Sequence, residues 1–258
     1  MSTPHQDRIP HPLRWSWRQA AAVAALAGSA LASEPHDISM MWLASDDPAT
    51  PISFNLAQAG SYAEQADGTI VYSGNMFSNT WQLSWTTRAG TQSDVLLDTM
   101  ISVTNMSSTD QWFTASTLLD SLDSSLNENL LTLAATVSVL NMQFSGDATI
   151  SSGETSLITS SVDGVVSGGL FESVYALTAA GPFGVASESD STAAMLNGIQ
   201  NALSQSVRFN LTAGDTATLH TISTLSSIPA PGGLAILACA AVGSVRRRRR
   251  SSRRRSHS

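Results

Sequence analysis

Apolar and polar residues alternate in several short runs through the middle of the chain, and Gly, Asn and Asp separate the runs. From Thr80 to Thr87, two tryptophans and a leucine face one way while polar side chains face the other. The same period of two returns in residues 97–103, 111–118, 207–211 and 216–225. This period is that of a half-buried strand, and short strands divided by turn residues are typical of antiparallel sheets. The sequence therefore predicts an all-β domain, an antiparallel β-sandwich of jelly-roll or Ig-like type.

Two segments depart from this period. The leucines between Leu119 and Leu133 recur at spacings of three and four, which suits one face of a helix, whereas residues 131–139 alternate as a strand does. We predict a strand for the second half of this segment and leave the first half open. A second, short helix is predicted near residue 200, with Asp190 or Ser191 as its N-cap. The apolar residues spaced to line it are Met195, Leu196, Ile199 and Leu203.

Charge is distributed unevenly along the 258 residues. All 13 basic residues are arginines, and eight of them lie in the last 13 positions. Residues 33–228 contain two arginines against 19 acidic residues, a formal charge of −17. A body this acidic repels polyphosphate, so nucleic acid is not expected as a partner. Basic ends around an acidic body indicate targeting or anchoring segments.

The first 32 residues have the order of a secretory signal peptide. Three arginines precede the apolar stretch Ala20–Leu31, and Ala30 and Ala32 supply the small residues of a cleavage site. Signal peptidase is expected to cut after Ala32, so that the mature chain begins at Ser33.

A second targeting pattern closes the chain. A Pro-containing motif precedes the uncharged stretch Leu234–Val245, and five consecutive arginines follow it. This is a stop-transfer pattern, in which the arginines stay on the cytoplasmic side. Twelve helical residues rise only about 18 Å, against about 30 Å of hydrocarbon, so we expect a transient membrane anchor. The motif is Pro229, Ala230, Pro231, Gly232 and Gly233, and the cytoplasmic cluster is Arg246, Arg247, Arg248, Arg249 and Arg250.

These residues resemble the PEP-CTERM type of bacterial sorting signal, which consists of a Pro motif, an apolar helix and an Arg cluster read by an exosortase. Ala230 stands where the name motif carries Glu, so the tail is a Pro-Ala-Pro-Gly variant. Gly232 and Gly233 also resemble the GlyGly-CTERM class, which a rhomboid-type protease processes. Either resemblance implies an exported protein held briefly in the inner membrane. The chain then divides into a signal peptide (1–32), an exported domain (33–228) and a sorting signal (229–258).

Few residues of the exported domain suit catalysis. It contains no Lys, and the single cysteine, Cys239, lies in the tail, which excludes disulfides within the domain and thiolate chemistry there. His220 lies on an alternating run, where a solvated side chain is expected and a Ser-His-Asp triad is the alternative. No Gly-x-Ser-x-Gly motif frames a serine. We therefore predict that the protein is not an enzyme.

Two kinds of residue suggest binding. Calcium takes oxygen ligands, and three acidic pairs or turns offer them, although none follows the EF-hand pattern. Trp81 and Trp85 share one strand face about 13 Å apart, so they would form a sugar-stacking platform if exposed and core if buried. The candidate calcium ligands are Asp46 with Asp47, Asp120 with Asp123, and Asp67 before Gly68.

The sequence thus predicts an exported cell-surface or extracellular-matrix protein with a structural, adhesive or binding role. It predicts no cofactor, with calcium as the one candidate ion. The expected partners are signal peptidase, an exosortase-type or rhomboid-type protease, the inner membrane and extracellular polysaccharide. The alternative is a secreted carbohydrate-active or ester hydrolase that uses acidic residues.

Overall fold

A computed structural model describes residues 37–47, 49–91, 94–120, 122, 128–197 and 201–228. By its internal contacts the chain divides into two units, residues 1–34 and residues 35–258. Every described residue belongs to the second of these units. The predicted signal peptide and the predicted sorting signal both lie outside the described residues. Within the described ranges, no helix has the length and apolar character needed to span a membrane.

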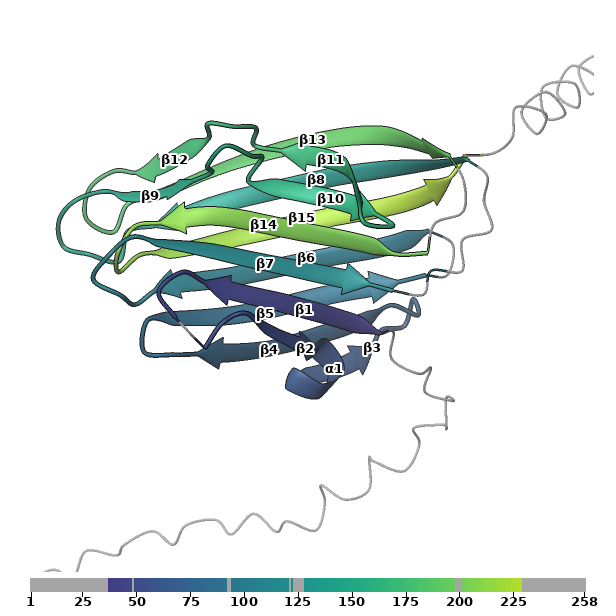
Figure 1. Cartoon of the computed structure of the whole chain (residues 1–258), viewed down its shortest axis with the longest axis horizontal. Helices are drawn as coiled ribbons and strands as arrows, with labels where there is room; N and C mark the ends of the chain where they lie inside the picture. The colour runs from purple at the N-terminus through teal and green to yellow at the C-terminus, as the bar shows by residue number, and fades with distance from the viewer. Residues whose placement is uncertain are drawn as a thin grey trace, which may run out of the picture. The chain divides into compact units, whose positions relative to one another are not determined.

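Two antiparallel sheets, here called sheet A and sheet B, pack face to face (Figure 1). Along sheet A the strands are β11 (Val165–Leu170), β10 (Ile158–Val162), β14 (Leu203–Leu211), β7 (Gln111–Leu119), β1 (Ile38–Ala44) and β2 (Ile52–Asn55), with β9 (Ala148–Ser151) on β14 and β12 (Ala176–Ala179) on β9. Along sheet B they are β13 (Val185–Asn197), β8 (Glu128–Leu140), β15 (Thr216–Ser227), β6 (Val95–Asn105), β5 (Trp81–Gly90), β4 (Ile70–Phe77) and β3 (Ser61–Glu64). One short helix, α1 (Leu56–Ala59), links β2 to β3. The prediction of an all-β antiparallel sandwich is confirmed.

The five runs that alternate in sequence are all strands, namely β5, β6, β7, β14 and β15. Their alternate side chains point into the space between the sheets and form one hydrophobic core. The two sheets have eight and seven strands, so the sandwich has 15 in total. A jelly roll has about eight strands in its two sheets together, and an Ig-like domain has about seven to nine. The additional strands are short ones at the margins, such as β3 and β12, whose sequences carry little alternation.

The short helix predicted near residue 200 is wrong. Met195 and Leu196 belong to β13, and Leu203 begins β14, while residues 198–200 lie outside the described part. β13 pairs with β8 along all 13 of its residues, and this ladder outweighs the helix propensity of the Ala, Met and Leu residues in it. The strand predicted for residues 131–139 is confirmed by β8, whose backbone is extended from Glu128 onward.

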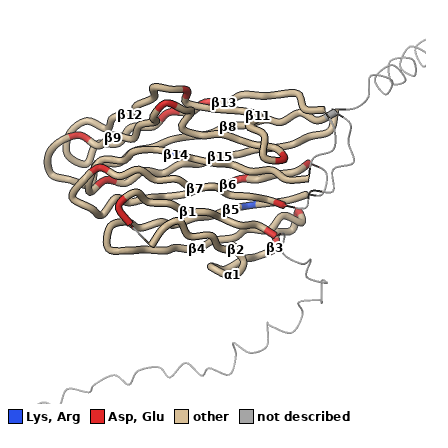
Figure 2. Tube along the Cα trace, viewed as in Figure 1, with Lys and Arg blue, Asp and Glu red and all other residues tan. Residues whose placement is uncertain are grey.

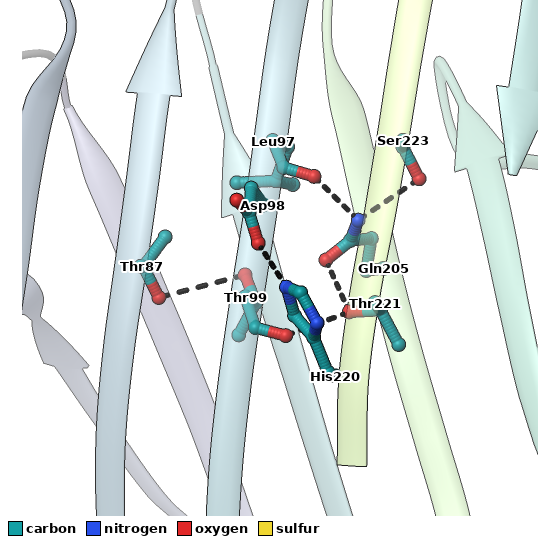
Figure 3. A network of polar contacts seen from close by, with 8 residues as sticks. All are labelled: Thr87, Leu97, Asp98, Thr99, Gln205, His220, Thr221 and Ser223. Carbon is teal, nitrogen blue, oxygen red and sulfur yellow. Dashed lines mark hydrogen bonds and ion pairs between the residues drawn. The ribbon is translucent and has the colours of Figure 1, made fainter. Parts of the chain in front are cut away.

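A buried polar network joins the two sheets inside the core (Figure 3). The Gln205 amide of β14 in sheet A donates to the Leu97 carbonyl of β6 and to the Ser223 hydroxyl of β15, both in sheet B. The Thr221 hydroxyl donates to the Gln205 carbonyl oxygen at 2.8 Å, and Ser160 lies 3.2 Å from Ser223. Because buried polar groups are costly unless they are paired, this network favours one relative placement of the two sheets.

Candidate functional site

Trp81 and Trp85 lie inside the sandwich. Each residue is only 2% exposed. The ring of Trp81 lies tilted against Trp42, with 5.4 Å between centroids, and that of Trp85 against Phe54, with 5.2 Å. The Trp81 Nε1 donates to Asp47 at 2.9 Å. Of the two alternatives for these tryptophans, the structure shows the core and not the sugar platform, because the face of β5 that carries them packs against sheet A.

The carboxylates of Asp46 and Asp47 are occupied by donors of the protein. The Thr109 hydroxyl donates to Asp46, and the Ala49 N–H and the Trp81 indole donate to Asp47. The Ala49 N–H lowers the pKa of Asp47 below its ordinary value, with a smaller contribution from Trp81. These two carboxylates close a turn at the end of β1, and their hydrogen bonds are structural.

Asp67 is bound in a similar way. The Thr69 hydroxyl and N–H lower the pKa of Asp67, and the guanidinium of Arg88 pairs with the same carboxylate. The third candidate calcium pair was Asp120 with Asp123, and Asp123 lies outside the described residues. Across the described ranges, no group of three or more His, Cys, Asp or Glu residues is placed to hold a metal ion.

His220 lies on the outer face of sheet B, where its Nε2 is 2.7 Å from the Asp98 Oδ1 (Figure 3). The two side chains are 43% and 26% exposed. A depression of about 280 Å³ opens beside the histidine, and Ser189 contributes to its wall. However, Thr136 of β8 stands between His220 and Ser189, which puts their backbones two strand spacings apart, about 9–10 Å. The described contacts of His220 include no serine, so they do not assemble a triad.

Replacing His220 with alanine should change the free energy of unfolding by no more than about 1 kcal/mol, since exposed ion pairs contribute little. Urea unfolding of both proteins measures this change. Ester and glycoside hydrolysis assays on the same samples provide the functional comparison. Hydrolysis by the parent that the variant lacks would contradict the prediction that the protein is not an enzyme.

Several hydroxyl groups on the outer face of sheet B pair across neighbouring strands. Thr136 lies 2.8 Å from Ser189, Ser138 donates to Ser187 at 2.8 Å, and Thr104 lies 2.9 Å from Thr216. These pairs use the hydroxyls within the sheet, and the charged side chains of this face, Arg88 and Asp98, are themselves paired, with Asp67 and His220. Most acidic residues gather in loops and at strand ends (Figure 2).

Two of the strongly exposed aromatic side chains lie in loops that sequence reasoning did not select, whereas a third, Phe77 (79% exposed), ends strand β4. Phe144 follows β8 and is 85% exposed, and Phe183 precedes β13 and is 53% exposed. Both phenylalanines lie outside the alternating runs, among Gly, Ser and Pro residues. The feature of the sequence that could have identified them is a bulky apolar residue within a turn-forming segment.

No protein-family model matches the sequence, and no curated protein matches it. Among solved structures, the chain is similar to a family 35 carbohydrate binding module from Clostridium thermocellum, with 12% identity and a TM-score of 0.22 over 61% of this chain and 93% of that chain. It is also similar to a family 11 carbohydrate-binding module from Clostridium thermocellum, in complex with a β-1,3-1,4-mixed-linked tetrasaccharide. That match has 14% identity and a TM-score of 0.22, over 61% of this chain and 91% of that chain. Both similarities are distant, so the description of the fold as a sandwich rests on the strands and sheets of this chain.

Proposed function

We propose that this chain is an exported, non-catalytic protein of the cell surface or extracellular matrix, delivered by its C-terminal sorting signal. The observation that carries the proposal is the position of that signal relative to the fold. The last strand of the sandwich ends at Ser227, and the motif begins two residues later at Pro229. A protease that cuts within Pro229–Gly233 would therefore release the sandwich without removing any strand.

The proposed partners follow from the two ends of the chain. Signal peptidase removes residues 1–32, the uncharged Leu234–Val245 segment holds the protein transiently in the inner membrane, and an exosortase-type or rhomboid-type protease frees it. The final location is then the cell surface or the medium.

For the body, we propose a binding role toward extracellular polysaccharide. A non-catalytic role is supported by the strand that separates His220 from Ser189 and by the donors of the protein that engage Asp47 and Asp67. The competing hydrolase would need a free acid and a free base facing one cleft.

N-terminal sequencing of the exported protein tests the first step. We expect the mature chain to begin at Ser33, because Ala30 and Ala32 place small residues at the cleavage site. Mass spectrometry of the released protein should find no peptide from residues 1–32. Recovery of that segment on exported protein would contradict the proposed signal peptide.

A further inference from the structure

We propose that the loops containing Phe144 and Phe183 form a binding site for a neutral glycan. This inference rests on the proposed binding role toward polysaccharide and assigns it a place and a ligand class. The site consists of the β8–β9 loop (residues 141–147) and the β12–β13 loop (residues 180–184), here called the distal loops. The two rings meet edge to face, with 5.0 Å between centroids and 84° between planes.

Hydrogen bonds tie the distal loops together. The side chain of Asn141, which is buried, donates to the Gly146 carbonyl at 2.9 Å and to the Gly181 carbonyl at 3.0 Å. The Gly181 N–H donates to Asp147 at 2.8 Å, and the Asn141 N–H donates to the Gly184 carbonyl. These bonds hold the two rings in place before any ligand arrives, which lowers the entropic cost of binding.

The backbone at Phe183 is strained, and the ring of this residue is exposed. Gly181, Pro182, Phe183 and Gly184 form a turn closed by the Gly184 N–H and the Gly181 carbonyl at 3.1 Å. Phe183 has φ of 55° and follows the proline, a position that favours glycine in a type II turn. A bulky residue with positive φ is uncommon, and such strain concentrates at functional sites. An aromatic side chain therefore occupies a position where glycine would stabilise the turn.

Polar groups and open space adjoin the rings. Asp147 is exposed, and its described contacts occupy one carboxylate oxygen, so the other can accept a hydrogen bond. A Cβ added at Gly146 or at Gly181 would meet no atom within 4 Å, so a ligand can approach the backbone there.

A pyranose matches these features. Its C–H faces are attracted to the negative face of an aromatic ring, and its hydroxyl groups donate to carboxylates. The formal charge of −17 on residues 33–228 repels acidic glycans and anionic lipids, which leaves neutral glycans as the favoured class. Two rings are also a small surface compared with the roughly 800 Å² per partner of a stable protein interface.

The location of the distal loops suits an external ligand. Leu140, just before the first loop, pairs with Thr216 at the start of β15, whereas the chain leaves β15 at Ser227. The eleven steps from Thr216 to Ser227 extend about 36 Å at about 3.3 Å per residue. Figure 1 shows the loops before β9 and before β13 at the left end, with the C-terminal end of β15 at the right. The aromatic pair therefore lies at the end of the sandwich opposite the attachment of the tail.

Affinity electrophoresis of the exported protein tests the proposal, with laminarin, mixed-linkage β-glucan, galactomannan and dextran as neutral probes and alginate as an acidic probe. We expect retardation by at least one neutral glycan and none by alginate. Phe144→Ala and Phe183→Ala should each weaken that binding about tenfold or more, as removal of a central aromatic contact does. Phe183→Gly should weaken it equally while the melting temperature stays the same or rises, because glycine relieves the strain.

The matched controls are Val165→Ala and Val166→Ala, which change apolar side chains of similar exposure, 67% and 64%, at the start of β11. They should bind as the parent does. Neutral glycan binding that survives both Phe→Ala changes would overturn the distal-loop site while leaving polysaccharide binding intact. Retardation by alginate alone would overturn the neutral ligand class, and no retardation by any probe would overturn the binding role itself.

Discussion

Replacing Trp85 with alanine should lower the free energy of unfolding by about 3–5 kcal/mol, the usual cost of removing a buried aromatic side chain. The ring lies in the core against Phe54. On the neighbouring strand, a Cβ at Gly74 would lie 2.3 Å from the indole, so the backbone there is already in contact with it. The structure can relax little into the cavity, which places the expected loss in this high range. Urea or guanidinium unfolding measures it.

Trp112→Ala provides the matched control, because Trp112 lies on the outer face of sheet A with Arg208 over its ring at 5.4 Å. Only part of its area is buried, so we expect a smaller loss of about 1–2 kcal/mol. If Trp85→Ala left stability unchanged and abolished glycan binding, the result would contradict the burial of the indole and support a sugar platform at Trp81 and Trp85.

Changes in the tail should produce the largest effects on location. Replacing Arg246–Arg250 with serine should weaken retention and let unprocessed chain pass outward. Moving each guanidinium through the membrane costs about 2.5–3.5 kcal/mol, so five of them hold the segment in place. Fractionation with one antibody to the sandwich and one to a C-terminal epitope would detect the uncleaved chain outside the inner membrane.

Replacing Pro229–Gly233 with an unrelated polar sequence should have the opposite outcome. The anchor and its arginines remain, but the protease no longer recognises its site, so full-length protein should accumulate in the inner membrane. The arginine variant serves as the comparison, since it alters the anchor and keeps the motif. If both variants mature and localise as the parent does, the C-terminus is not a sorting signal.

Strand positions could be predicted from the sequence wherever one face of a strand is buried and the other is exposed to solvent. β5, β6, β7, β14 and β15 all show this alternation, and the structure places them as expected. β13 was mispredicted because it is an edge strand with mostly exposed residues, so its sequence carries no clear period of two. Its extended conformation comes from pairing with β8.

The candidate site was less predictable than the fold. The signals at Ala30 and Ala32 and in the tail are linear patterns, and they remain predictions because they lie outside the described residues. Trp81 and Trp85 could be placed on one strand face from sequence, but whether that face was covered depended on sheet A. His220 could be placed on a strand, whereas its partner Asp98 is 122 positions away in sequence.

By itself, the sequence determined the all-β class, most long strands and the faces they share, because alternation is a local property of the chain. The tertiary structure alone decided which faces are buried, how Gln205 joins the sheets and which aromatic rings reach solvent. These properties depend on residues far apart in the chain meeting across two sheets. Phe144 and Phe183 are the clearest case, since 38 residues separate two rings whose centroids lie 5.0 Å apart. The pairings of β8 with β13 and of β9 with β12 bring their loops together.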